Sequence, residues 1–241
     1  MPNQSQLTGA IVVAAQGIYS ESSTQLHGIG ELVHSNDGRA FRYTKVGGTA
    51  LVPGKLYQGP AEDTTNFQAL TVTAPLAGAT SIVTTTTVTL AVNALAGGFL
   101  VIASATTNAG QIARIQGNTV ATAAVVTFTL DDPIVYAPTG TVVVDVHPNP
   151  LNGVIINPTT ATSAPKGVAL YKVTAAYYGW LQTKGPAVIL SDAGSTVGTN
   201  VSASNATAGA VEAEVTAQAH VGIALTGVAT AEYGLFDINL A

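Results

Sequence analysis

Residues 126–130 read Val-Thr-Phe-Thr-Leu, and residues 142–146 read Val-Val-Val-Asp-Val. In both segments the apolar side chains recur at every second position. This pattern is typical of a strand with one buried face, because successive side chains of a β-strand point to opposite sides of the sheet. The pattern recurs at 70–73 and at 211–216, although Ala and Glu in the latter are also compatible with a helix.

Turn-forming sequences separate these segments, among them Asn-Asp-Gly at 36–38, Pro-Gly at 53–54 and Asn-Gly at 152–153. The resulting spacing of about 8 to 12 residues between strands is that of a β-sandwich or barrel. We therefore expect an all-β chain made of small β-barrel or sandwich modules.

The composition is unusual in its low charge. The chain has 241 residues, of which 9% are charged, against roughly 25% in a typical soluble domain. Eight Lys and Arg against 13 Asp and Glu give a net charge of −5 without a basic run, so nucleic acid is not an expected partner. The lack of cysteine excludes disulfides, Cys-ligated zinc and thiol nucleophiles.

No membrane partner is expected either. The most apolar stretch, 90–105, is interrupted by Asn93 and by the glycines at 97–98, and it is too short and too strand-like to span a bilayer. No Lys or Arg precedes Arg39, so the charged start of a secretory signal is missing. We expect a soluble protein made in the cytoplasm.

Two composition changes suggest that one module is inserted into another. Residues 70–147 are the richest in Thr and Val, and they end at the two prolines of 148–150, which favour an extended connection. We expect 70–147 to form a barrel inserted into a discontinuous β domain of 1–69 plus 148–241. Three serial modules are the alternative.

The last third of the chain contains an internal repeat. Residues 167–181 align without gaps to residues 222–236, 55 positions later, with seven of fifteen positions identical. Each copy is expected to form a strand, a short turn and a returning strand, and the two hairpins could together close a small barrel with approximate two-fold symmetry.

The candidate metal ligands lie in one short segment. His27, Glu31, His34 and Asp37 are the one cluster of metal-capable side chains, but their spacing matches no recognised motif, and a solvated polar loop is the favoured interpretation. The acidic pair at 131–132 precedes a proline, which favours a strand-end turn over a calcium site. We expect no metal and no cofactor.

The sequence contains no signature of an enzyme. In Gly-Ser-Thr-Val-Gly at 194–198 the Ser takes the second place, not the third as in the nucleophile elbow of serine hydrolases. The glycine pairs at 47–48 and 97–98 lack the spacing and the lysine of a phosphate-binding loop. No catalytic residue is assigned.

Tyr177, Tyr178 and Trp180 form the one aromatic cluster, and the repeat aligns Tyr233 with Tyr178. These side chains could bind a sugar or a protein, but packing in the core or at a subunit interface is the favoured interpretation. The scarcity of Lys and Glu also favours association, because these residues are depleted from interfaces. We therefore expect a homo-oligomer.

Several segments together give the chain a family resemblance. They are Asp-Gly-Arg-Ala-Phe-Arg-Tyr at 37–43, Leu-Val-Pro-Gly-Lys-Leu-Tyr-Gln at 51–58, Pro-Asn-Pro-Leu-Asn-Gly-Val at 148–154, Gly-Val-Ala-Leu at 167–170, Tyr-Gly-Trp-Leu-Gln-Thr-Lys-Gly-Pro-Ala at 178–187 and Gly-Ile-Ala-Leu at 222–225. In these segments the chain resembles the small β-rich head proteins of tailed bacteriophages that decorate or cement the capsid.

The resemblance implies a structural, non-enzymatic component of the virion, made in the bacterial host cytoplasm and bound to the major capsid protein on the capsid surface. It also implies a homo-oligomer, with a trimer as one arrangement, but it identifies no contact residue. The alternative is a tail-fibre, spike or neck component acting as an adhesive module for glycans or proteins. A virion-associated cell-wall hydrolase is a third hypothesis.

Overall fold

The computed structural model describes residues 16–122 and 125–240, and it confirms the all-β class. The chain divides into two compact units, residues 62–149 and residues 1–61 with 150–241. The inserted module expected at 70–147 is part of a slightly larger compact unit, which also includes the short helix α1 (Thr64–Phe67). The backbone N–H of Ala69 donates to Asp145 Oδ1 at 2.8 Å, which ties this segment to the unit.

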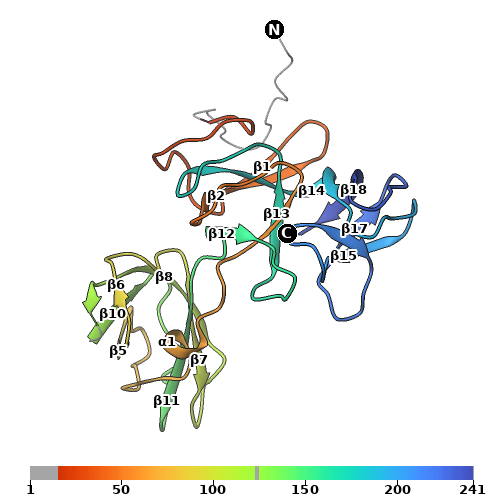
Figure 1. The fold of residues 1–241 in the computed structure, drawn as a ribbon. Coiled ribbons are helices and arrows are strands. Elements are labelled where there is room, and N and C mark those ends of the chain that lie inside the picture. Colours follow the sequence, from red (N-terminus) through yellow and green to blue (C-terminus); the bar gives the residue numbers. More distant parts are fainter. Residues whose placement is uncertain (1–15, 123–124, 241) are drawn as a thin grey trace. The chain divides into compact units, whose positions relative to one another are not determined.

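The inserted unit, 62–149, is a six-stranded antiparallel sheet in the order β4-β11-β7-β8-β10-β5 (Figure 1). The strands are β4 (Leu70–Val72), β5 (Ser81–Thr85), β7 (Phe99–Ser104), β8 (Ile112–Asn118), β10 (Val125–Leu130) and β11 (Val142–His147), with a separate pair of β6 (Thr89–Leu90) and β9 (Ala121–Thr122). The Thr84 hydroxyl on β5 donates to the Thr71 carbonyl on β4 at 3.4 Å, so the two edges approach one another and the sheet is a nearly closed barrel.

The expected alternation decides which side chains fill this barrel. Val126, Phe128 and Leu130 on β10 are buried, and so are Val142, Val144 and Val146 on β11. These six side chains belong to one hydrophobic cluster.

The other unit contains two barrels, and the first is closed. Its strands follow one another around the barrel in the order β2, β12, β3, β13 and β14, and β14 pairs again with β2. The bounds are β2 (Ala40–Val46), β12 (Asn152–Ile156), β3 (Leu56–Gln58), β13 (Pro165–Ala169) and β14 (Tyr178–Leu190). All neighbours are antiparallel except β2 and β12, which are parallel. A further strand, β1 (Leu32–His34), pairs with β2.

The second barrel, in blue in Figure 1, begins with the second half of β14. Its strands follow in the order β14, β18, β17, β15 and β16, with bounds β18 (Tyr233–Asn239), β17 (His220–Ala224), β15 (Asn200–Ala203) and β16 (Val211–Ala213). A parallel bridge between Ser191 and Val211 closes it. The long strand β14 therefore belongs to both barrels.

The two barrels are copies of one another. In the first, Val168 pairs with Gln182 and Ala169 with Leu181; in the second, Ile223 pairs with Asp237 and Ala224 with Phe236, at the positions aligned by the repeat. The turn between the strands is also duplicated, because Ala176 and Ala231 have φ angles of 64° and 62°. The parallel pair Val46–Val154 in the first barrel corresponds to Ser191–Val211 in the second.

This arrangement differs from our expectation that the two hairpins would close one barrel together. Each hairpin belongs to its own barrel, because β14 is 13 residues long and pairs with β2 along its first half and with β18 along its second. The duplication also identifies the insertion point. The inserted unit follows β3 and precedes β12, and the equivalent strands β15 and β16 are joined directly by residues 204–210.

Candidate functional site

The outer face of the first barrel, where β2 lies beside β14, is covered by the chain's own residues. Tyr43 and Trp180 are opposite one another in register, as are Phe41 and Gln182. Residues 16–34 lie over them, and Phe41, Tyr43 and Trp180 form a buried cluster with Ile18 and Val33 from this segment. We call residues 16–34 the cover segment.

Hydrogen bonds hold the cover segment at Gln16. The Tyr43 hydroxyl donates to Gln16 Oε1 at 2.7 Å, and Gln16 Nε2 donates to the carbonyl of Tyr178 at 2.9 Å. The indole N–H of Trp180 donates to the carbonyl of Gln16 at 3.2 Å. The polar edges of the buried aromatic rings are thereby satisfied by the cover segment and not by solvent.

The three aromatic residues singled out from the sequence lie in different environments. Trp180 is buried, with 2% of its surface exposed. Tyr178 is half-buried and stacks on Tyr43 with 6.1 Å between ring centroids. Tyr177, also half-buried, packs against the interior of the first barrel. They do not form a common exposed platform.

The equivalent face of the second barrel has no such cover among the described residues. Pro186 and Val188 of β14 lie beside Asp237 and Leu235 of β18, at the positions that Phe41 and Tyr43 take beside Gln182 and Trp180 in the first barrel. Val188 is 52% exposed and Tyr233 is 53% exposed. We call Pro186, Val188, Tyr233 and Leu235 the open face.

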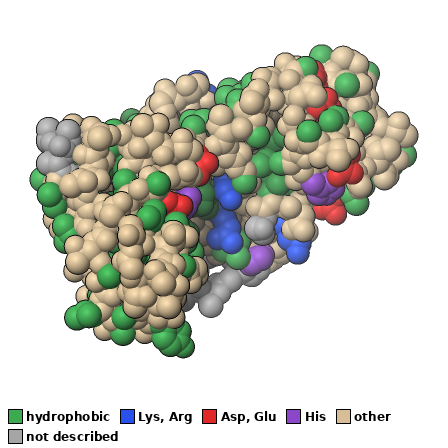
Figure 2. Space-filling view, turned by 90° about the horizontal axis from the view of Figure 1, so that it is seen from below, with side chains coloured by type: hydrophobic (Ala, Val, Ile, Leu, Met, Phe, Trp, Pro, Cys, Tyr) green, Lys and Arg blue, Asp and Glu red, His purple; other side chains and the backbone are tan. Residues whose placement is uncertain are grey.

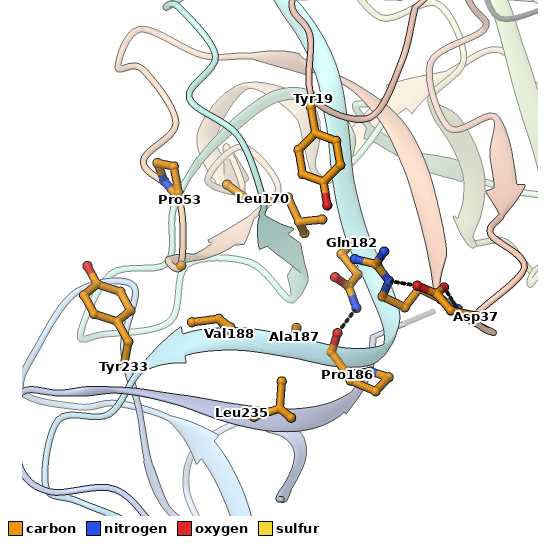
Figure 3. A pocket seen from close by; sticks show the side chains of 13 residues that line it. Tyr19, Asp37, Pro53, Leu170, Gln182, Pro186, Ala187, Val188, Tyr233 and Leu235 are labelled. Carbon is orange, nitrogen blue, oxygen red and sulfur yellow. Dashed lines mark hydrogen bonds and ion pairs between the residues drawn. The ribbon is translucent and has the colours of Figure 1, made fainter. Parts of the chain in front are cut away.

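The open face forms the floor of a pocket of about 590 Å³, and Figure 3 shows Tyr233 at one side of it, Asp37 at the other and Tyr19 at the top of the view. Pro53, Gly54 and Leu170 add to its lining, so the pocket spans the junction of the two barrels. Tyr19 belongs to the cover segment. The cover of the first barrel therefore borders the pocket.

One buried polar atom faces this pocket. Gln182 is 1% exposed, and its Nε2 donates to the carbonyl of Pro186 at 2.8 Å, as Figure 3 shows. Its Oε1 has no hydrogen-bond partner, and in Figure 3 the side chain lies among the residues that line the pocket. This oxygen is enclosed by the protein, so a ligand in the pocket reaches it only if the surrounding residues shift.

The charged residues of the pocket are paired with one another. Arg39 Nε donates to Asp37 Oδ2 at 2.7 Å. A hydrogen bond from the Ser35 hydroxyl, with further ones from Arg39, lowers the pKa of Asp37 despite its partial desolvation. Burial opposes the charged form of Arg39, but hydrogen bonds with Asp37 and Tyr19 outweigh it and raise the pKa of the guanidinium. The two charged residues that line the pocket, Asp37 and Arg39, therefore pair with one another, and none of its other described lining residues is charged.

The candidate metal ligands do not converge. His27 Nδ1 lies 3.3 Å from Glu31 Oε1, and the His27 ring packs against Tyr43 and Trp180. His34 is exposed, and Asp37 pairs with Arg39. Over residues 16–122 and 125–240, no three His, Asp or Glu side chains are grouped so that they could hold a metal ion.

The remaining candidates from the sequence are the acidic pair at 131–132 and the segment around Ser195. Asp131 lies 3.7 Å from Arg114, and Asp132 is exposed. Ser195, in the segment that superficially resembles a nucleophile elbow, exchanges backbone hydrogen bonds of 2.9 Å with Val228, and this bridge is the counterpart of the one between Leu51 and Val173.

Sequence reasoning did not identify Val188 or Gln182 as site residues. The one available signal was the alignment of Tyr233 with Tyr178, which marks equivalent positions without indicating that only one is covered. Comparison with known proteins adds no further assignment, because no family model, no curated protein and no solved structure matches the chain. No helix in the described part of the chain has the length and apolarity needed to cross a membrane.

Proposed function

We propose that this chain is a structural virion protein that binds the outside of a phage capsid and stabilises it, with the major capsid protein as its partner. The proposal rests first on the resemblance to capsid decoration proteins in segments between residue 37 and the C-terminal region. Several of these segments are barrel strands or the turns beside them, among them β2, β13 and β14. They include the open face residue Pro186.

The observation that carries the proposal is a surface with few charges and with large apolar side chains exposed on both units. On the inserted unit, Val83 and Val125 lie on the paired strands β5 and β10 and are 53% and 57% exposed. On the two-barrel unit, Val188 and Tyr233 are exposed on the open face. Figure 2 shows one side of the molecule, on which charged side chains occupy a small part of the surface. Exposed apolar patches of this kind favour protein–protein contact.

A cement protein needs only a modest free energy from each copy. Ligand binding to the assembled state stabilises it by mass action, and the symmetry of a capsid multiplies the contribution of each site. A module with few charges and several apolar patches fits this role, because it can contact neighbouring capsid subunits without charge-specific steering.

A second candidate is an adhesive module of a tail fibre, spike or neck. The observation that favours it is the pocket, which has two exposed tyrosines, Tyr19 and Tyr233, beside an apolar floor. Exposed aromatic rings combine apolar contact area with a polar hydroxyl, and sugar recognition uses both.

Co-sedimentation tests the proposal. Purified protein is mixed with expanded capsids assembled without it, and the pelleted protein is measured over a range of concentrations. Saturation at a fixed copy number per capsid subunit is expected. No binding to expanded or unexpanded shells would contradict the proposal, and binding of the chain to a glycan array would then favour the adhesive module.

A further inference from the structure

The two barrels present the same outer face in two states, one covered and one open. We propose that the open face of the second barrel is the docking site for an extended, uncharged and apolar segment of the capsid protein, which takes the place that the cover segment has on the first barrel. This inference rests on the proposed function and identifies the surface through which it would act.

The equivalence of the two faces follows from strand register. Trp180 pairs with Tyr43 in the first barrel, and Leu235 pairs with Val188 in the second. Each residue of the first pair is at most 2% exposed, because the cover segment lies on it. Val188 is 52% exposed at the position where Tyr43 is buried. Equivalent outer faces are therefore covered on the first barrel and exposed on the second.

The first barrel also indicates what form the occupant takes. The cover segment contains one strand, β1, and for the rest consists of turns and extended chain between Gln16 and Glu31. It inserts apolar side chains such as Ile18 between hydrogen bonds to backbone and ring groups. A chain segment of this type fits a concave pocket of about 590 Å³ better than a second flat sheet would.

The chemistry of the pocket narrows the occupant further. Its floor is apolar, and the ion pair between Asp37 and Arg39 is closed, so a charged side chain would find no free partner among the described lining residues. On the first barrel the cover segment binds through hydrogen bonds to backbone and ring groups as well as through apolar contacts, which favours an uncharged polypeptide over a free apolar molecule.

Within residues 16–61 and 150–240, every strand of the two-barrel unit belongs to a barrel, except β1, which lies in the cover of the first. Under the proposed function the occupant of the open face is a segment of the capsid protein. Residues of this chain outside the described ranges, and a second copy, are the competing occupants that the tests below distinguish.

A pair of matched substitutions tests the inference. Val188→Asp places a charge in the open face, whereas Val197→Asp places one on a residue that is 63% exposed, belongs to the same unit and lies outside the pocket. Both variants are compared with the wild type by capsid co-sedimentation, and thermal unfolding verifies that each is folded. We expect Val188→Asp to weaken capsid binding at least tenfold and Val197→Asp to leave it within twofold. Tyr233→Asn provides a second variant of the open face, because Tyr233 is exposed.

The outcomes distinguish a failure of the proposed function from a failure of the docking site alone. Failure of the wild type to bind capsids would overturn the proposed function. Binding by the wild type and equally by Val188→Asp and Tyr233→Asn would overturn the docking site alone. If Val188→Asp or Tyr233→Asn lost self-association in sedimentation velocity but bound capsids like the wild type, a second copy would be the occupant of the open face. That result would also overturn the inference.

Cross-linking identifies the occupant directly, because the chain contains no cysteine. A benzophenone maleimide attached to Val188→Cys is expected to cross-link to one segment of the capsid protein on irradiation, and the same probe on Val197→Cys is expected not to. Mass spectrometry of the cross-linked peptide should find an uncharged apolar stretch. A cross-link only within the chain or between its copies would contradict the proposal.

Discussion

Tyr178 and Tyr233 occupy equivalent positions in two copies of one barrel, yet Tyr178 stacks on Tyr43 beneath the cover segment whereas Tyr233 is 53% exposed. The difference arises from chain order. The cover segment precedes β2, which is the first strand of the first barrel, whereas the corresponding strand of the second barrel is the latter half of β14 and is preceded by the first half of the same strand. The second barrel therefore has no cover of its own in the described chain.

The first prediction concerns the buried aromatic cluster. Trp180→Ala should lower the free energy of unfolding by about 3–5 kcal/mol, the usual cost of deleting a large buried ring, because Trp180 packs against Tyr43 and Ile18 and donates a hydrogen bond to Gln16. Urea unfolding at neutral pH measures the change. Tyr233→Ala, at the exposed position aligned with Tyr178, is the control and should cost under about 1 kcal/mol. Equal losses in the two variants would contradict the conclusion that the face of the first barrel is covered and that of the second is open.

The second prediction concerns two glycines at aligned positions. A Cβ on Gly167 would lie 2.8 Å from the carbonyl oxygen of Gln182, and one on Gly222 would clash with that of Asp237. These are backbone atoms on the neighbouring strand, so Gly167→Ala and Gly222→Ala should each destabilise the protein by about 1–3 kcal/mol through overpacking. Gly48→Ala is the matched control, because nothing lies within 4 Å of its Cβ. Thermal unfolding that ranks Gly48→Ala with the other two would contradict the prediction.

The sequence predicted the strands better than their pairing. Alternation correctly indicated that Phe128 points into a core, and the repeat correctly aligned the hairpins, because both signals are local. Closure of the first barrel depends on β2 meeting β12 and β14, which are far apart from it in the chain. Residues 40–46 and 185–191 occupy equivalent places in the two barrels and are identical at no position, so sequence comparison could not have shown that β14 serves both.

The site was less predictable than the fold. Tyr178 and Trp180 were visible as an aromatic cluster, but whether such residues are buried depends on a cover segment more than 140 residues earlier in the chain. Of the candidate metal ligands, the structure brings together His27 and Glu31 and leaves His34 and Asp37 elsewhere, because Asp37 turns toward Arg39 and Ser35. Sequence spacing contains none of this information.

The third prediction concerns acid stability. Hydrogen bonds from the hydroxyls of Thr207 and Ser204 lower the pKa of Asp192 below its ordinary value of 3.8, despite some desolvation. Because the folded pKa is depressed, the unfolded chain binds more protons in acid, and the stabilisation is present above the unfolded pKa and is lost as the pH falls below it. Asp192→Asn should therefore be less stable than the wild type at pH 7, and the difference should narrow toward pH 3. Melting temperatures measured across this range test it. A difference that stays constant with pH would contradict the assigned cause.

The fourth prediction follows from the insertion point. In the second barrel, residues 204–210 join β15 to β16, whereas in the first barrel the connection between the equivalent strands β3 and β12 contains the inserted unit. Replacing residues 59–151 by the sequence of 204–210 should leave a chain that folds cooperatively, because both barrels keep all of their strands. Leu151 is lost in this variant, so a chain that keeps Leu151 and replaces only 59–150 is the matched comparison and should be the more stable, since Leu151 packs in the core of the first barrel.

Circular dichroism and thermal unfolding report on both variants, and residues 62–149 alone should fold as a separate β protein with the core around Phe128. If neither shortened chain unfolded cooperatively, the two-barrel unit would depend on the insert, and the interpretation of residues 204–210 as the uninterrupted counterpart would be wrong.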